Sequence, residues 1–330
     1  MGDGVTAALA TALADLAGSL RYEPLLGLTI TQDGVPQLAG HREAALLCLR
    51  DYVYARYFCR WEPGAAARTR YSDRASGDPS FVATLVAAAH NATCWEPGWK
   101  VVKADADWAF VSNGRLNLFV DDRAHLMPAG ALVGEPAQVR MPCARENLSP
   151  GFFYLVGRAG PIDRQAAYLK LYLNLTCAGA APLVEALSRG PQLERLRFEA
   201  KVANSPGGYC RVDSALVYVE PRSYPGLVSF LRAQRRAHPS RWRDETPLFT
   251  RALGPGLAVA EAAPGHSKES FGQQRCRLVA EEVLRALEIG ELAPARWLSF
   301  VAARFGREGL NLEAPRHLAG RRRLAVSQRG

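Results

Sequence analysis

Lysine is scarce in this 330-residue sequence, which contains five lysines and thirty-six arginines. Arginine keeps its proton in proteins, whereas burial or nearby cations can make a lysine neutral. A lysine kept in a chain that otherwise uses arginine therefore points weakly to chemistry that arginine cannot perform. The alternative at each position is that the lysine has no special role and is present by chance. The five lysines are Lys100, Lys103, Lys170, Lys201 and Lys268.

Long apolar runs and clustered cysteines are also missing. No stretch of eighteen apolar residues occurs, so we expect no transmembrane helix and no membrane partner. The first twenty residues lack the early basic residues of a secretion signal and predict an amphipathic helix, which makes the cytoplasm the expected location. Seven scattered cysteines show no CxxC or Cys/His spacing, so we expect buried free thiols, no metal site and no cofactor.

The familiar motifs of several enzyme classes are absent. The sequence has no Walker A motif, no GxGxxG, no HExxH and no GxSxG, and Asp163-Arg164 is not part of a kinase catalytic loop. The net charge of +9 suits nucleic acid or a phosphorylated or acidic partner. Because no basic repeat interleaved with aromatic residues occurs, we do not expect nucleic acid as the partner.

The hydrophobic periodicity predicts an α+β fold, with a mostly antiparallel sheet flanked by helices. A helical N-terminal region, 1–95, is expected to pack on an α+β core, 96–330. Asn113-Gly114 predicts a type I′ hairpin turn between two strands. Strands are expected over 98–104, 107–112, 115–120, 137–141, 151–158 and 167–175. Helices are expected over 3–18, 42–58, 79–91, 180–189, 224–237, 270–288 and 292–304.

The segment 198–220 predicts a second hairpin, with a loop over 204–208. In that register Lys201 lies opposite Arg211, and Glu199 lies opposite Asp213. Side chains alternate between the two faces of a strand, so the pattern assigns two faces to this hairpin. The apolar face is expected to carry Phe198, Ala200, Val202, Val212, Ser214 and Leu216. The polar face is expected to carry Arg197, Glu199, Lys201, Arg211 and Asp213.

The strand expected over 167–175 repeats this design. Its leucines alternate with Tyr168, Lys170, Tyr172 and Asn174. A solvated outer face is the plain interpretation, but a face lined with lysine, tyrosine and asparagine is also typical of the floor of an anion pocket.

A helix N-terminus adds to this pattern. Ser270 is a candidate N-cap, and Lys268 and Arg275 flank it in the sequence. The free N–H groups of a helix N-terminus favour a phosphate, although an ordinary capped helix has the same sequence features.

Several cations around one lysine that can become neutral suit an enzyme that binds phosphate and removes a nearby proton. β-Elimination from phosphoserine or phosphothreonine needs these groups. A free lysine has a pKa near 10.4, and it must fall by roughly two to three units for the lysine to act as a base. Burial and an opposing Arg211 would both lower it. A bound phosphate dianion opposes the shift, so the base is best placed beside the α-carbon of the substrate.

Four segments, 151–160, 167–175, 198–220 and 247–284, resemble the HopA-type effector family. They read GFFYLVGRAG, AYLKLYLNL, FEAKVANSPGGYCRVDSALVYVE and PLFTRALGPGLAVAEAAPGHSKESFGQQRCRLVAEEVL, and the resemblance covers about residues 100–290. Founding members are bacterial type III secreted effectors, and relatives are partner subunits in the biosynthesis of modified peptides such as class V lanthipeptides and thioamitides. The resemblance implies a phosphoserine or phosphothreonine lyase and no cofactor. Its partners would be a precursor peptide and a separate phosphotransferase-like kinase, and its product would be dehydroalanine or dehydrobutyrine.

The resemblance also implies roles for individual residues. Lys201 would be the base, and His266 or Tyr209 the acid. The related phosphothreonine lyases use a K-x-H arrangement, and the nearest analogue here, 266–268, has the reversed order. The expected phosphate ligands are Arg211, Lys170, Arg275, Lys103 and Lys268. The expected positioning residues are Tyr172, Asn174 and Asp213.

Two other functions stay open at this point. The chain could be a non-catalytic scaffold that binds the precursor peptide and the kinase, or an effector-like protein that binds a host or signalling partner. Replacing Lys201 by alanine separates a lyase, which would stop, from a scaffold, whose binding would persist.

Overall fold

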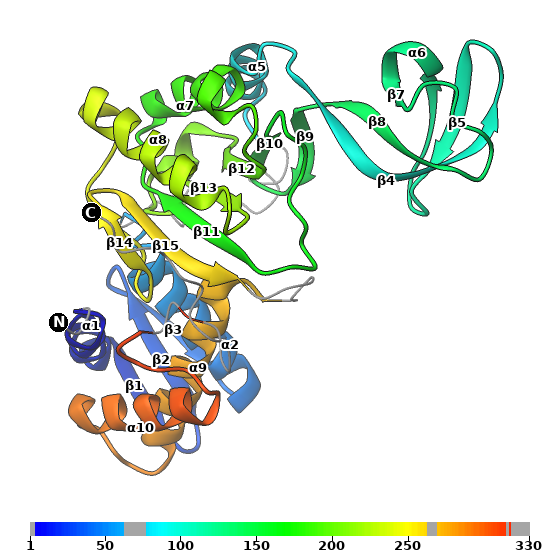
Figure 1. Ribbon diagram of the computed structural model, residues 1–330. Helices are drawn as coiled ribbons and strands as arrows, with labels where there is room; N and C mark the ends of the chain where they lie inside the picture. The colour runs from blue at the N-terminus through cyan, green and yellow to red at the C-terminus, as the bar shows by residue number, and fades with distance from the viewer. Residues whose placement is uncertain (1–3, 63–76, 263–268, 315–316, 318–330) are drawn as a thin grey trace.

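The computed structural model describes residues 4–62, 77–262, 269–314 and 317. Helices lie on both sides of a large antiparallel sheet (Figure 1), which confirms the α+β prediction. Two smaller antiparallel sheets accompany it. No helix among these described residues is long and apolar enough to cross a membrane.

The central sheet has seven strands in the order β14-β15-β11-β13-β12-β10-β9, and every adjacent pair is antiparallel. Its middle strands are buried on both faces, because helices cover each side. The strands are β9 (Ala144–Ser149), β10 (Phe152–Val156), β11 (Tyr168–Leu173), β12 (Phe198–Ala203), β13 (Ala215–Val219), β14 (Arg251–Gly254) and β15 (Leu257–Ala262).

Three helices pack on one face of this sheet: α5 (Pro79–Ala88), α7 (Ala180–Arg189) and α8 (Tyr224–Ala237). The leucines of β11 point into this layer, as the alternation predicted. Short 3-10 helices connect elements at Cys177–Gly179, Pro191–Leu193, Pro206–Tyr209 and Pro239–Arg241.

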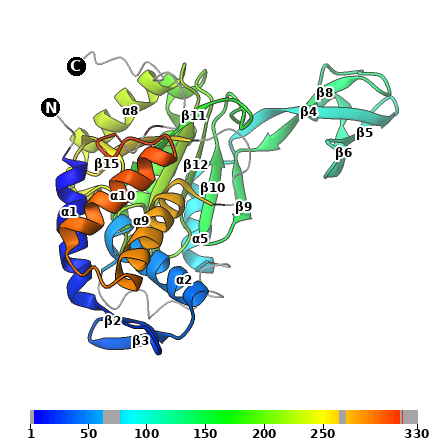
Figure 2. The same cartoon turned by 90° about the horizontal axis from the view of Figure 1, so that it is seen from below.

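The opposite face is covered by helices from both ends of the chain (Figure 2). The buried side chains of the N-terminal helices and of the last two helices form one core cluster with Tyr172, Leu216 and Ala258 of the sheet. The helices are α1 (Val5–Ser19), α2 (Arg42–Val53), α9 (Phe271–Glu288) and α10 (Pro294–Arg307), with a π-helical turn at Tyr54–Phe58 after α2.

The N-terminal region also contains a three-stranded sheet that the sequence analysis missed. Its strands are β1 (Leu20–Glu23), β2 (Gly27–Gln32) and β3 (Val35–Ala39). Asp33 and Gly34 turn the chain between β2 and β3 with φ angles of 50° and 79°. Asp-Gly with both residues in the left-handed region is a preferred two-residue hairpin turn.

The segment between α5 and β9 forms an arm that projects from the body (Figure 1). Its five strands have the order β6-β5-β4-β8-β7 and enclose a small core of their own. The elements are β4 (Thr93–Ala104), β5 (Trp108–Ser112), β6 (Asn117–Asp121), α6 (Asp122–His125), β7 (Leu126–Met127) and β8 (Pro136–Pro142).

The predicted hairpin at Asn113-Gly114 joins β5 and β6, but its turn lies one residue later than expected. Gly114 takes the first central position with φ +82°. The side chain of Asn113 accepts the N–H groups of Arg115 (3.0 Å) and Leu116 (2.8 Å). The turn is therefore not type I′, which needs positive φ at both central residues.

Candidate functional site

Lys170 and Lys201 lie on the same face of the central sheet. Residues directly opposite each other in antiparallel strands share a face. Lys170 of β11 lies opposite Tyr218 of β13, and Tyr218 lies opposite Glu199 of β12, two residues before Lys201. On the other side of β12, Lys201 lies opposite Tyr154 of β10. We call this side of the sheet, defined by these five residues, the lysine face.

Aromatic rings surround both amines. The Nζ atom of Lys201 lies 4.2 Å from the ring centroid of Phe152 and 6.0 Å from that of Tyr218. The Nζ atom of Lys170 lies 5.9 Å from the same Tyr218 ring. Both lysines are half-buried. The two amines therefore share one aromatic neighbour, and the sheet holds them on either side of β13.

The pKa of Lys170 is lowered to about 8, mainly by burial. The positive charges of Lys201, Arg164 and Arg275 act in the same direction. Lowering the pKa from 10.5 to about 8 means that the fold holds the charged amine at a cost of about 3 kcal/mol. Because the folded-state pKa is depressed, this cost is fully present below about pH 8 and is lost as the pH rises from about 8 to the unfolded value of 10.5. A lysine that is partly neutral near physiological pH suits a general base.

Beside the lysines lies a cluster of polar residues that the sequence analysis did not select. The guanidinium carbon of Arg164 lies 4.0 Å from the ring centroid of Tyr218, and its Nη2 donates to the Tyr154 hydroxyl at 2.7 Å. Arg164 also forms an ion pair with the buried Glu199, and the Tyr154 hydroxyl donates to the same carboxylate. Burial and the Glu199 charge raise the pKa of Tyr154. This cluster fixes one side of the lysine face.

Alternation had placed Glu199 beside Lys201 on the predicted polar face. It gave no signal for Arg164, because residue 164 lies in the irregular segment between β10 and β11.

Arg275 reaches the lysine face from α9. Its guanidinium carbon lies 4.6 Å from the ring centroid of Phe271, and its Nη2 donates to the carbonyl of His317 at 3.1 Å. Burial lowers the pKa of Arg275 to about 10, while Tyr172 opposes this shift. The positive charge of Arg275 contributes to the lowered pKa of Lys170.

Ser270 is the N-cap of α9, as predicted, and forms a complete capping box with Gln273. The Gln273 N–H donates to the Ser270 hydroxyl at 3.3 Å, and the Ser270 N–H donates to the Gln273 side chain at 2.9 Å. Two of the N–H groups that we expected to favour a phosphate are thus engaged within the helix terminus. Phosphate binding is therefore better assigned to side chains than to this end of the helix.

The predicted hairpin register is wrong. Lys201 lies opposite Leu216, not Arg211, and Leu216 therefore shares the face of Lys201 instead of the predicted apolar face. The connection between β12 and β13 is longer than the predicted loop, because residues 204–214 include a 3-10 helix and an irregular turn. The offset is an odd number of residues, so it reverses the face assigned to the second strand.

Arg211 and Asp213 consequently lie in the connection, where they pair with each other. Two nitrogens of Arg211 donate to the Asp213 carboxylate, one of them at 2.6 Å. Arg211 also contacts the Sγ atom of Cys59 at 3.0 Å and lies 5.3 Å from the Trp61 ring centroid. Burial lowers the pKa of Arg211, and Asp213 more than offsets this, so the guanidinium stays charged. These contacts indicate that the Arg211–Asp213 ion pair stabilises the fold and does not bind phosphate.

The remaining predicted residues are distributed over the molecule. Tyr172 is on the lysine face, but it is buried against Phe58 and Phe271, and burial raises its pKa. Tyr209 packs in the core beneath the other face of the sheet and donates to the carbonyl of Ala203 at 2.8 Å. The structure therefore separates the Tyr209 hydroxyl from the two amines.

Asn174 follows the end of β11 and donates to the carbonyl of Glu245 at 3.1 Å, which fixes a loop. Lys103 is exposed near the end of β4, in the projecting arm. His266 and Lys268 lie outside the described residues, so their predicted roles stay predictions.

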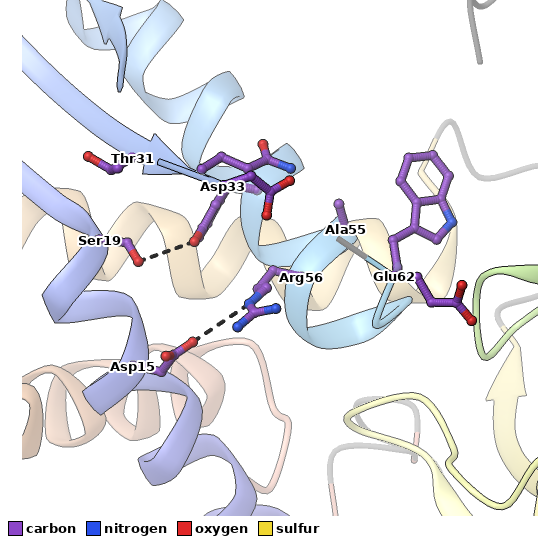
Figure 3. Close-up of a pocket in the computed structure, with 10 residues that line it drawn as sticks. Asp15, Ser19, Thr31, Asp33, Ala55, Arg56 and Glu62 are labelled. Atoms are coloured by element: carbon purple, nitrogen blue, oxygen red, sulfur yellow. Dashed lines mark hydrogen bonds and ion pairs between the residues drawn. The ribbon is translucent and has the colours of Figure 1, made fainter. Parts of the chain in front are cut away.

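A hollow of about 240 Å³ between α1, β2 and the end of α2 is a separate feature (Figure 3). Two of its three acidic residues form ion pairs within the protein: Asp15 with Arg56 at 3.7 Å, and Glu62 with Arg243 at 2.7 Å. None of its lining residues belongs to the lysine face. Within the described part of the chain, no group of three or more histidine, cysteine or acidic residues is placed to hold a metal ion.

Comparison of the sequence with models of known protein families finds a match to one family. The sequence model of the HopA1 effector protein family matches residues 143–317, a segment that contains the whole central sheet and α9. None of the curated proteins with which the chain was compared matches it.

The solved structures that are similar to the chain include two effector proteins. One is the effector protein from Pseudomonas syringae pv. tomato strain DC3000, with 13% identity and a TM-score of 0.43, covering 84% of this chain and 97% of that chain. The other is the effector protein from Pseudomonas syringae pv. syringae strain 61, with 18% identity, a TM-score of 0.41 and the same two coverages.

Proposed function

The chain belongs to the HopA1 effector protein family, and from this premise we propose that it is a lyase that eliminates phosphate from phosphoserine or phosphothreonine in a peptide. The observation that carries the proposal is the placement of Lys170 and Lys201 on one sheet face, with the pKa of Lys170 lowered to about 8. A neutral amine and fixed cations in one place are what this elimination needs.

In the proposed reaction, the neutral amine of Lys170 removes the proton from the α-carbon. The electron pair of that C–H bond forms the Cα–Cβ double bond, and the Cβ–O bond breaks. Both electrons of the Cβ–O bond leave with the phosphate. Lys201 stabilises the departing dianion by a charge-assisted hydrogen bond, and the buried Arg275 adds positive charge nearby. The product is dehydroalanine from serine or dehydrobutyrine from threonine.

This assignment exchanges the roles of the two lysines that we inferred from the sequence. Burial of Lys170 favours its neutral form, and a direct phosphate contact would oppose that form. Lys201 lies against Phe152 and Tyr218, where a cation is stabilised by the ring faces. Lys170 is therefore the better base, and Lys201 the better phosphate ligand.

The finer proposal is that the substrate is a precursor peptide in the biosynthesis of a modified peptide, such as a lanthipeptide or thioamitide. A separate phosphotransferase-like kinase would phosphorylate it first. This part of the proposal rests on the resemblance of this sequence to relatives that act in such pathways.

The proposal is tested by incubating the purified chain with a chemically synthesised phosphothreonine peptide and following the peptide mass. We expect loss of phosphoric acid, followed by addition of a thiol to the new double bond. Loss of the phosphoryl group with retention of the hydroxyl would indicate a phosphatase and contradict the proposal. An unchanged mass with peptides of several sequences would contradict it as well.

A non-catalytic scaffold is the second candidate, and the arm favours it. Phe119, Leu132 and Val133 are each more than 60% exposed there. Exposed apolar side chains on one projecting element suit contact with another protein. A scaffold would bind the peptide or kinase without changing the peptide mass, so the same experiment separates the two functions.

A further inference from the structure

The proposed elimination needs a proton for the leaving phosphate as well as a base. A phosphothreonine is mainly a dianion at neutral pH, because its second pKa is about 6. When the Cβ–O bond breaks and its electron pair leaves with the oxygen, that dianion becomes a trianion unless the bridging oxygen gains a proton. Tyr209, one of the predicted acids, donates to the carbonyl of Ala203 beneath the other face of the sheet. The lysine face therefore needs a proton donor of its own.

Tyr218 lies between the two amines of the lysine face. It is on β13, directly opposite Lys170 of β11, and β13 separates β11 from β12, which carries Lys201. Its ring centroid lies 5.9 Å from the Nζ atom of Lys170 and 6.0 Å from that of Lys201. In the substrate, the bond that breaks lies between the α-proton and the phosphate. A side chain between the base and the phosphate ligand is therefore well placed for the bridging oxygen.

The hydroxyl of Tyr218 is available to a ligand. Its oxygen makes no hydrogen bond with the residues that the structure describes, and it is not sealed from solvent, although only 8% of the residue is exposed. Tyr154 on the same face differs, because its hydroxyl already donates to the Glu199 carboxylate. Tyr218 thus combines a position between the lysines with an uncommitted O–H group.

Cations around Tyr218 would stabilise the phenolate that remains after its proton has been donated. The guanidinium carbon of Arg164 lies 4.0 Å from the Tyr218 ring centroid, and the ion pair with Glu199 holds Arg164 in place. The two lysines flank the same ring. Fixed positive charges beside a group that becomes negative are effective in catalysis, because they need no rearrangement during the reaction.

We propose that Tyr218 is the catalytic acid of the elimination. Its hydroxyl proton passes to the bridging oxygen as the Cβ–O bond breaks, so the phosphate leaves as the hydrogen phosphate dianion and Tyr218 becomes a phenolate. Lys170 has by then taken the α-proton, and its ammonium group, on the residue directly opposite, returns a proton to the phenolate. Both side chains are restored without another proton source. The inference rests on the proposed function and adds the residue that supplies the proton.

Tyr218→Phe tests the inference, because it removes the hydroxyl and keeps the ring that packs against Arg164. Tyr168→Phe is the matched control. The Tyr168 ring centroid lies 6.1 Å from that of Tyr218, and the guanidinium carbon of Arg164 lies 5.1 Å from it. Rate constants of single turnovers on a saturating synthetic phosphothreonine peptide are measured for the wild type and both variants between about pH 5 and pH 9.

Near pH 8, Tyr218→Phe is expected to be slower than the wild type by roughly 10²-fold or more, the usual contribution of a general acid. This factor should shrink as the pH falls through about 6, since a monoanionic phosphate carries a proton of its own. Tyr168→Phe should stay close to the wild type throughout. A loss that is the same at every pH would indicate a structural role and overturn the inference. A comparable loss in Tyr168→Phe would overturn it as well.

The outcomes also separate the inference from the proposed function. A wild type that eliminates phosphate, together with a fully active Tyr218→Phe, would refute the acid alone and leave the lyase in place. A wild type that leaves the phosphopeptide unchanged would refute the proposed function and the acid with it.

Discussion

Replacing Lys170 by arginine is expected to lower kcat for phosphate elimination by roughly 10²–10⁴-fold, the usual contribution of a general base. Arginine keeps the positive charge and much of the length of lysine, but it does not become neutral. The variant therefore removes the base and leaves the charge of the lysine face nearly unchanged. The rate constant of a single turnover on a saturating phosphothreonine peptide is the measurement.

Lys201→Arg is the control for this prediction. It keeps the positive charge next to Phe152, so kcat should fall by less than about tenfold if Lys201 only binds phosphate, while Lys201→Met should raise KM. An active Lys170→Arg with an inactive Lys201→Arg would return the role of base to Lys201, as the sequence first indicated. Full activity of both arginine variants would exclude either lysine as the base.

Replacing Asp213 by alanine is expected to lower the free energy of unfolding by about 3–5 kcal/mol. The variant leaves Arg211 charged and largely buried without its carboxylate partner. Typical domains are stable by only about 5–15 kcal/mol, so this loss is large. Urea unfolding followed by circular dichroism gives the value.

The double variant Arg211→Met/Asp213→Leu is the comparison, because removing both charges should restore much of the lost stability. Sequence reasoning had given both residues a role in the site, Arg211 as a phosphate ligand and Asp213 as a positioning residue. A stable Asp213→Ala variant that no longer eliminates phosphate would support that earlier role and contradict a structural one.

Much of the fold follows from local pattern. The helices at Ala180–Arg189 and Tyr224–Ala237 match the predicted 180–189 and 224–237, because their apolar residues recur at helical spacing. The hairpin of β12 and β13 was also expected, but its register was not. Both strands are buried on both faces, so polarity did not mark which residues of β13 accompany Lys201. The ends of the connecting loop therefore could not be found by alternation.

The site was predictable only in part. Alternation within a strand correctly grouped Lys170 with Tyr168 and Tyr172. The meeting of Lys170 and Lys201 depends on the position of β13 between their strands, which is a tertiary feature. Arg164 joins them from an irregular segment, so no periodic signal indicated it.

The central claim is that Lys170 loses its proton near pH 8 because burial and the charges on the lysine face disfavour its charged form. Only five lysines need to be resolved, so NMR titration of the protein labelled with ¹³C at the lysine ε-carbons tests it directly. The signal missing in Lys170→Met identifies the residue. We expect a midpoint at about 8 in the wild type, and a higher midpoint in Lys201→Met, since a like charge has been removed. A midpoint for Lys170 near the free value of about 10.4, unchanged by Lys201→Met, would contradict the account.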